Sequence, residues 1–414
     1  MIQGGLAYIF GSSVIAQVCR LVSSIVVIRH LPKEEYGLFA GADNIYSYLS
    51  VFVGLGLVNS VLQFCSEKRT EEFKNGVYWY ALTRGAVFNI GVSIVVFGLA
   101  LYNESRGDRQ ISNYLHLMCG YPFTAFFLNF SQTALRVRQK NREYAYTNIL
   151  LSVLTVLGNI TFTCVWGISG LICSKYVADV GALAFSGWQL KKDDFFKRVT
   201  SRVRLPHNDK KSILSYGAVG AVTNFTSSML VLLDVSCLNL VLSSSEVLAD
   251  YKVAATIPSA MVFVPSCLIT YGFPQIVSSF SEGTSAFLKK VKEQTKIFAV
   301  LAFVIALGLF LFAPVIIYVL YGEKYLNVVP IFRVLSLNFF VYAGFRYLFG
   351  NVIAAMRKPK INLLHTIAAG ILNVVLNVVL IQRYGSIGAA VATTCVTVFV
   401  LMLEIAYLYW YFKK

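Results

Sequence analysis

Residues 7–62 read AYIFGSSVIAQVCRLVSSIVVIRHLPKEEYGLFAGADNIYSYLSVFVGLGLVNSVL. The stretch divides into an apolar segment over 7–28, a short polar turn and a second apolar segment over 38–62. Each segment is long enough to cross a bilayer as a helix, which requires about 20 apolar residues. Each also contains a charge, Arg20 in the first and Asp43 in the second. Because a charge at membrane depth is costly, it usually faces protein or water and marks a pathway.

The composition of the whole chain is that of a polytopic membrane protein. Of its 414 residues 57% are hydrophobic and 14% are charged, whereas about 25% of a soluble domain is charged. No cleavable leader is expected, because the first apolar run is too long and lacks a basic region before it. The eight cysteines form no CxxC pair, so neither a disulfide framework nor a metal site is expected.

Apolar runs predict twelve membrane-spanning helices, over 7–28, 38–62, 77–102, 112–135, 144–166, 170–190, 213–242, 248–276, 295–320, 326–355, 362–382 and 386–410. The linkers after every second span, together with the C-terminus, hold 24 of the 36 Lys and Arg residues, against six in the remaining linkers. Such residues concentrate on the cytoplasmic side, so both termini are predicted to be cytoplasmic. The net charge of +16 therefore reflects topology, and no nucleic acid partner is expected.

The longest linker, residues 191–212, divides the chain into an N-terminal half over 1–190 and a C-terminal half over 213–414. The linker is strongly basic and contains Phe195 and Phe196. Two aromatic rings among basic residues indicate a segment that lies on the anionic surface of the membrane. A solvated linker with two stray aromatic residues is the alternative.

The two halves resemble repeats of one unit. The glycines of 166–170 (WGISG) and 384–388 (YGSIG) match at a constant offset of 218, as do Asn159 and Asn377. Each half has an even number of spans and so points the same way, which implies a pseudo-twofold axis along the membrane normal. Chance spacing of glycines in apolar sequence is the alternative. The predicted fold class is thus an all-α polytopic bundle of two six-helix halves.

Polar residues follow helical spacing on the equivalent spans of the two halves. The stripes are Ser13, Gln17, Arg20 and Ser24; Asp43, Ser47, Ser50 and Gly54; Asn224, Ser227 and Asp234; and Lys252, Thr256 and Ser259. Residues spaced by three and four share one helix face, and these faces are predicted to line one water-filled cleft between the two halves. Polar helix packing is the alternative, but it explains the serines better than it explains Arg20.

Further charges within the spans fit ordinary structural roles. Lys175 and Asp179 stand four residues apart on one helix, a spacing at which they form an ion pair. Asp250, Lys252 and Glu404 lie towards span ends, where a side chain can simply reach the interface. The chain shows no P-loop, HExxH or GxSxG motif, so no enzymatic activity and no cofactor are expected.

The order of these parts resembles the Wzx-type flippases of O-antigen and polysaccharide repeat units. They are the polysaccharide-transport branch of the multidrug/oligosaccharidyl-lipid/polysaccharide (MOP) exporter superfamily, whose fold is MATE-like. The resemblance covers essentially the whole chain. The stretches that carry it are LPKEEYGLFA at 31–40, Asp234, LADYKVA at 248–254, YGEKY at 321–325, MRKPK at 356–360 and YGSIGAA at 384–390. The chain departs from the family at Ala249-Asp250, where the family usually has a small residue and an apolar one.

The resemblance implies a bacterial inner-membrane protein that moves an undecaprenyl-diphosphate-linked repeat unit from the cytoplasmic to the periplasmic leaflet. It implies membrane lipids as surroundings, and polymerase and chain-length proteins of O-antigen or lipopolysaccharide biosynthesis as partners. The guanidinium group of an arginine presents several N–H donors that can bind a diphosphate, so Arg20 is the leading candidate for binding the substrate. The other substrate-binding candidates are Gln17, Arg84, Asn224, Lys252, Arg333 and Arg346. The candidates for binding a coupling H⁺ or Na⁺ are Asp43, Asp234 and Asp250.

Two other functions fit a polytopic chain. A drug exporter of the same superfamily has a similar outline but a cleft that is more apolar or more acidic. An O-antigen polymerase or ligase usually needs a large external loop with basic residues, and here the external linkers are short.

Overall fold

The computed structural model describes residues 2–66, 69–200, 205–356 and 358–413, and all the regular elements of these residues are helical. The predicted all-α fold class is therefore confirmed. The helices are α1 (Ile2–His30), α2 (Lys33–Ser50), η1 (Val53–Gly56), α3 (Leu57–Ser66), α4 (Glu71–Ser105), α5 (Arg109–Met118), α6 (Tyr121–Val137), α7 (Asn141–Lys191), α8 (Phe195–Thr200), α9 (His207–Leu242), α10 (Ser245–Met261), α11 (Phe263–Glu282), α12 (Thr284–Leu311), α13 (Ala313–Tyr321), η2 (Glu323–Val328), α14 (Val329–Val341), η3 (Tyr342–Arg346), α15 (Tyr347–Ala355) and α16 (Pro359–Lys413).

Within the described residues, eight helical stretches are long and apolar enough to cross a membrane. They are Phe10–His30, Lys33–Ser66, Glu71–Ser105, Asn141–Lys191, Ser245–Ile269, Thr284–Leu311, Glu323–Ala355 and Lys360–Lys413. Two of the predicted spans are not among these eight. The span over 112–135 is divided at Gly120 into α5 and α6, and the span over 213–242 contributes the shorter apolar stretch Leu232–Leu242. The chain is a multi-pass membrane protein.

Large apolar side chains on the outside of these helices support a lipid environment. Ile94 of α4, Val300 of α12 and Ile371 of α16 are each about two-thirds exposed, at 64%, 64% and 65%. A soluble protein rarely leaves such side chains exposed in contiguous patches. Lipid tails are the surroundings that these surfaces suit.

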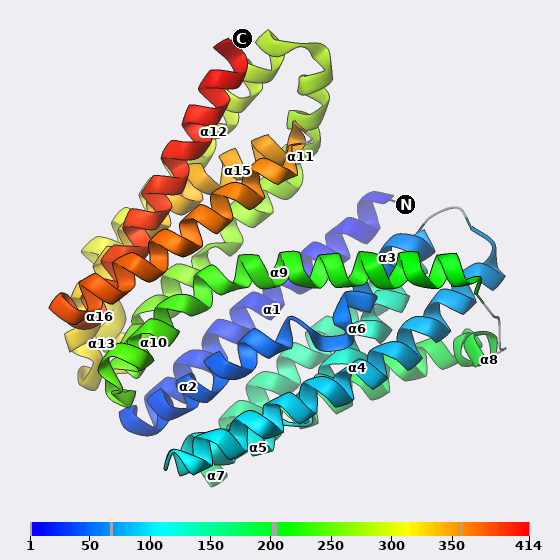
Figure 1. Ribbon diagram of the computed structural model, residues 1–414, viewed down its shortest axis with the longest axis horizontal. Helices are drawn as coiled ribbons and strands as arrows, with labels where there is room; N and C mark the ends of the chain where they lie inside the picture. Colours follow the sequence, from blue (N-terminus) through cyan, green and yellow to red (C-terminus); the bar gives the residue numbers. More distant parts are fainter. Residues whose placement is uncertain (1, 67–68, 201–204, 357, 414) are drawn as a thin grey trace. The chain divides into compact units, whose positions relative to one another are not determined.

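The long helices α7 and α16 each contain two predicted spans and bend sharply at one glycine. Gly167 has φ 57° and ψ −135°, and Gly385 has φ 60° and ψ −140°. This backbone region is nearly closed to residues with a Cβ. The two limbs of α16 are seen in orange and red in Figure 1. Gly167 and Gly385, which glycine spacing predicts to be equivalent, thus have nearly the same backbone conformation.

The helix predicted over 38–62 is interrupted, which the sequence pattern did not indicate. Gly54, Leu55 and Gly56 have positive φ values of 61°, 48° and 66°, and they separate α2 from α3. The amide N–H of Gly54 donates to Asn89 Oδ1 on α4 at 2.8 Å. This bond satisfies a backbone donor that the break would otherwise leave without a partner.

The chain forms two compact units, Met1–Ser228 and Met229–Lys414, and α9 contributes to both. In the first unit, a core cluster joins Leu57 of α3, Tyr78 of α4, Phe130 of α6 and Ile213 of α9. The Ser60 hydroxyl also donates to the carbonyl of Ile213 at 2.8 Å. In the second unit, α11, α12, α15 and the end of α16 share a cluster around Phe287.

The described part of the basic linker carries the short helix α8. Phe195 is buried and makes an edge-on contact with Tyr78 at 5.0 Å between ring centroids. A membrane-surface position is therefore wrong for Phe195, although Phe196 is exposed. Residues 201–204 of the predicted interfacial segment lie outside the described residues. Lys140 pairs with Asp193 immediately before α8, and Arg138 approaches the same carboxylate at 3.8 Å.

This ion pair makes a pH-dependent contribution to stability. The hydrogen bond from Lys140 lowers the pKa of the Asp193 carboxyl below its usual range. The lowered pKa means that the contribution is complete above the unfolded-state pKa and is lost as the pH falls through the folded-state value. We expect Asp193→Asn to cost less than about 1 kcal/mol at neutral pH, because the pair is solvent-screened. The difference from wild type should disappear in acid, as measured by chemical unfolding in detergent.

Glu104→Gln, which changes an exposed carboxylate at the end of α4, is the matched control for Asp193→Asn. It should leave the unfolding free energy unchanged at both pH values. An Asp193→Asn effect that persists unchanged in acid would assign the loss to packing of the linker and not to the ion pair.

Candidate functional site

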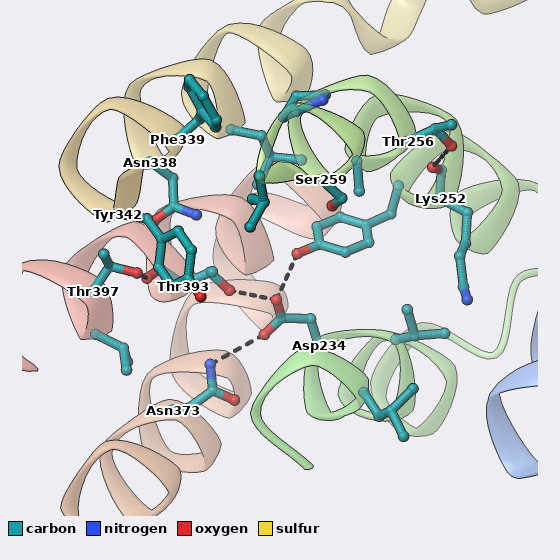
Figure 2. A pocket seen from close by; sticks show the side chains of 18 of the residues that line it. Asp234, Lys252, Thr256, Ser259, Asn338, Phe339, Tyr342, Asn373, Thr393 and Thr397 are labelled. Atoms are coloured by element: carbon teal, nitrogen blue, oxygen red, sulfur yellow. Dashed lines mark hydrogen bonds between the residues drawn. The ribbon is translucent and has the colours of Figure 1, made fainter. Parts of the chain in front are cut away.

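The second unit contains a cavity of about 540 Å³ between α9, α10, α14, η3 and α16. Figure 2 shows the polar side chains that line it, of which Thr393 and Asn373 point at Asp234 of α9. The lining residues that carry polar atoms are Asp234, Tyr251, Lys252, Thr256, Ser259, Asn338, Tyr342, Arg346, Asn373, Thr393 and Thr397. A concave site with few convergent polar groups in an apolar surround is typical of a binding site.

Asp234 is the centre of the hydrogen-bond network in this cavity. Its side chain is 3% exposed. Tyr251 Oη donates to Oδ2 at 2.6 Å, and the Thr393 hydroxyl donates to the same oxygen. Asn373 Nδ2 and Asn377 Nδ2 donate to Oδ1 at 3.1 Å and 2.9 Å. The carboxylate thus accepts four hydrogen bonds, which matches its capacity.

The four donors are neutral, and no Lys or Arg of the described residues forms an ion pair with Asp234. The negative charge is therefore stabilised by dipoles alone. Asn377 Nδ2 also donates to Asn373 Oδ1 at 2.9 Å, while Asn377 Oδ1 is buried without a hydrogen-bond partner among the described residues. Carboxylate, amide and hydroxyl oxygens are the ligands that hard cations prefer. Because the four acceptor positions of Asp234 are filled, a small cation or a proton binds here only by displacing one of these donors.

The stripe predicted on the eighth span lies on one face of α10, within the second unit. Lys252, Thr256 and Ser259 all line the cavity, and Figure 2 shows them along one side of it. Arg346 enters from η3, a single π-helical turn within the otherwise α-helical stretch from α14 to α15. Its guanidinium lies over the Tyr342 ring, 5.5 Å from the centroid. π-Turns of this kind occur frequently at functional sites.

Two other candidates of the second unit do not line this cavity. Asp250 is buried and accepts a hydrogen bond from Asn327 Nδ2 at 2.7 Å. The Nε group of Arg333 donates to the Phe310 carbonyl at 3.3 Å, and its guanidinium lies 5.3 Å from the centroid of the Phe310 ring. Both side chains thus contact residues of the surrounding helices. The alternative that Asp250 and Glu404 reach the membrane interface is wrong, because both are buried, at 8% and 4% exposed.

The remaining candidates belong to the first unit. Arg20 is exposed on α1, and its Nη2 donates to Gln17 Oε1 at 2.6 Å. Arg84 on α4 and Asn224 on α9 are exposed, and Asp43 on α2 is half-buried. The side chain of Ser227, from the predicted stripe on the seventh span, lies outside the described residues.

The first unit contains an uncharged counterpart of the Asp234 network. Asn159 Nδ2 donates to Ser23 Oγ at 2.6 Å, and the Ser174 hydroxyl donates to Asn159 Oδ1. Ser23 lies on the first span, and Asn159 and Ser174 lie on the two limbs of α7. In the second unit, Asp234, Asn377 and Thr393 occupy the seventh span and the two limbs of α16. The helices thus correspond, but the network of the first unit is uncharged whereas that of the second contains an acid.

The same unit contains the predicted ion pair of Lys175 and Asp179. Lys175 Nζ lies 3.1 Å from Asp179 Oδ2. Thr124 Oγ1 donates to the same oxygen at 3.1 Å, and Asp179 is buried. The prediction of an ion pair is confirmed, and this acid has a basic partner, whereas Asp234 has none among the described residues.

Sequence reasoning missed the partners that give Asp234 its environment. Tyr251, Asn373 and Thr393 were not identified as site residues, and Asn377 was noted only as a repeat marker. A signal was present, because Asn373 and Asn377 stand four residues apart in an otherwise apolar run. Thr393 and Thr397 show the same spacing.

Comparison with known proteins adds independent information. A sequence model of the family described as polysaccharide biosynthesis protein matches residues 26–330. The uncharacterized membrane protein MJ1068 of Methanocaldococcus jannaschii is 22% identical over 392 residues, which cover 89% of this chain and 76% of that protein. The probable low-salt glycan biosynthesis flippase Agl15 of Haloferax volcanii is 23% identical over 378 residues, covering 88% of this chain and 74% of that protein.

Solved structures resemble the fold over almost the whole chain. An inward-facing multidrug resistance MATE family transporter of the MOP superfamily has a TM-score of 0.81 at 14% identity and covers 96% of both chains. The lipid II flippase MurJ in an inward closed conformation has a TM-score of 0.76 at 13% identity, covering 97% of this chain and 87% of that one. The predicted MATE-like fold is therefore confirmed.

Proposed function

The chain belongs to the polysaccharide biosynthesis protein family, and on this premise we propose that it moves a lipid-linked glycan across a membrane. The observation that carries the proposal is the cavity of the second unit, where Lys252 and Arg346 stand beside polar groups within an apolar bundle. A glycan headgroup needs hydroxyl and amide partners because crossing hydrocarbon without them is costly. The phosphates of such a headgroup need positively charged side chains as partners. The protein acts as a transporter and not as an enzyme.

The specific substrate we propose is an undecaprenyl-diphosphate-linked repeat unit of an O-antigen or capsule, as in Wzx-type flippases. The name of the Agl15 protein, a glycan biosynthesis flippase, supports the substrate class. The direction is from the cytoplasmic to the periplasmic leaflet of a bacterial inner membrane, with both termini cytoplasmic. The excess of Lys and Arg in alternate linkers supports this orientation.

We further propose that Asp234 binds the coupling ion, H⁺ or Na⁺. Its four neutral donors and the buried oxygen of Asn377 support this assignment over Asp250, which is bound to Asn327 outside the cavity. Of the other predicted ion-binding residues, Asp43 is half-buried in the first unit. The structural likeness to a multidrug transporter keeps small-molecule export as the second candidate function.

Deletion of the gene in its own host tests the proposal. A flippase mutant should accumulate one complete lipid-linked repeat unit on the cytoplasmic leaflet and lose the surface polymer. The mass of that lipid identifies both the sugar and the polyprenol. Normal polymer together with increased dye sensitivity would instead establish small-molecule export. Single repeats that reach the outer leaflet and remain unpolymerised would indicate a polymerase.

Arg20→Gln tests the leading substrate residue. We expect export to fall about tenfold, equivalent to ~1.4 kcal/mol, because an exposed guanidinium on an apolar helix is lost. Arg20→Lys keeps the charge and should recover part of the activity. Arg109→Gln, an exposed arginine at the start of α5, is the matched control. Full export by Arg20→Gln at normal membrane levels would remove this role.

A further inference from the structure

A carboxyl group in the second unit takes part in none of the interactions described above. Glu404, on the second limb of α16, is 4% exposed, and its Oε2 atom has no hydrogen-bond partner in the part of the chain that the structure describes. Its Oε1 atom faces Gly350 of α15, where an added Cβ would lie 3.4 Å away. An ionised carboxylate in such a place is costly without a donor or a cation. The group therefore needs a proton or a positively charged partner.

Arg346 stands four residues before Gly350, the residue that the Glu404 carboxyl faces, so Arg346 and Gly350 lie on one side of the same helical stretch and the guanidinium is one turn from Glu404. It extends from η3 into the Asp234 cavity and forms no ion pair with an acidic side chain of the described residues. Two further titratable groups lie around the same guanidinium. Tyr342 stacks on it from the same π turn, and His365 of the first limb of α16 is within its electrostatic reach. The Nδ1 atom of His365 is also buried without a hydrogen-bond partner among the residues described.

We propose that Glu404 is a proton-binding site linked to the cavity through Arg346. While an anionic group in the cavity pairs with Arg346, Glu404 holds its proton. When the cavity is empty, the Oε2–H bond of Glu404 gives its proton to water, and the resulting carboxylate pairs with Arg346. The guanidinium stays charged throughout and changes only its partner. The proposal rests on the proposed function in one respect, namely that the cavity receives an anionic headgroup.

This arrangement differs from the Asp234 network in its chemistry. Asp234 accepts four neutral hydrogen bonds, whereas Glu404 Oε2 accepts none from the described residues. The proton site proposed at Glu404 is therefore separate from the ion site proposed at Asp234. Linkage requires that anion binding at Arg346 and proton binding at Glu404 strengthen each other by the same factor.

Infrared spectroscopy of the full chain in lipid bilayers tests the proton site directly. A protonated-carboxyl C=O band should be present in mildly acidic buffer, should disappear as the pH rises, and should be missing in Glu404→Gln. Asp179→Asn, which changes a buried acid paired with Lys175, is the control and should keep the band. In Arg346→Gln the band should persist to higher pH, because the partner of the carboxylate is gone. The proposal is overturned if Glu404→Gln removes no band, or if the band never titrates.

Inorganic pyrophosphate serves as the probe of linkage. In wild-type protein, saturating pyrophosphate should raise the pH at which half of the Glu404 band is lost. The proton concentration at this midpoint should fall by roughly tenfold. The affinity for pyrophosphate should fall more steeply with rising pH in wild type than in Glu404→Gln. Because pyrophosphate itself titrates equally in both measurements, its own titration does not affect the difference between the two slopes. Equal slopes would overturn the linkage. A band that titrates in a protein that exports no glycan would leave the proton site standing and overturn the proposed function alone.

Discussion

Asp234→Asn is expected to abolish coupled transport in a protein that still reaches the membrane at normal levels. The amide has the shape of the carboxylate, but it loses the charge and presents an NH₂ group to side chains that are themselves donors. Hydrogen bonds to a charged group contribute about 1.5–3 kcal/mol each. Those energies are lost from the network, and the carboxylate charge that would attract a cation is lost as well, so we expect cation affinity to fall by about 100-fold or more. Transport measured in vesicles against Na⁺ and pH gradients checks this.

Asp250→Asn provides the matched control, because Asp250 is also a buried acid of the second unit but lies outside the cavity lining. Its transport rate should stay within a few-fold of wild type. Asn373→Ala removes one donor and should show an intermediate loss. If Asp234→Asn transports at the wild-type rate with unchanged dependence on both gradients, the acid is a structural group and the coupling ion binds elsewhere.

Gly385→Ala and Gly167→Ala are expected to lower the free energy of unfolding by about 1–3 kcal/mol each. Both glycines have a φ near +60° with ψ near −140°, a conformation that a Cβ disfavours. The cause is backbone strain and not crowding, because no atom lies within 4 Å of a Cβ built on Gly385. Thermal unfolding in detergent measures the effect, and the double variant should show the sum of the two losses.

Gly187→Ala and Gly308→Ala are the matched controls for these bends. Both residues are within helices, and no atom lies within 4 Å of an added Cβ. Alanine at such a position should stabilise the helix by about 0.5–1 kcal/mol. A result in which the bend variants and these controls behave alike would show that the helices α7 and α16 adjust their bends without strain.

The local features of this fold could be predicted from the sequence. Glycine spacing predicted the repeat that recurs at Gly167 and Gly385, and helical spacing predicted the cavity face of Lys252, Thr256 and Ser259. The cavity face depends on one helix alone, where residue spacing determines direction. Interactions across helices were harder to predict. The donors to Asp234 at Asn377 and Thr393 lie 143 and 159 residues away, and no periodicity relates such positions.

The burial of two acids also could not be predicted from spacing along a single helix. Asp250 and Glu404 lie near predicted span ends, where position along a helix suggests an exposed side chain. The neighbouring helices bury them instead. Likewise, the break between α2 and α3 depends on Asn89 of α4, which receives the Gly54 amide. A break that is stabilised by a residue 35 positions away cannot be read from the apolar pattern of its own span.

The paired glycine bends also bear on the ancestry of the chain. Two nearly identical backbone conformations, 218 positions apart in corresponding helices, are best explained by duplication and fusion of one ancestral gene. Before the fusion, two identical subunits would have carried two equivalent polar networks. After it, each copy was free to change alone, and today the network of one half contains the acid Asp234 while the network of the other is uncharged. The fusion thus allowed the polar network of one half to acquire a buried acid independently of the other.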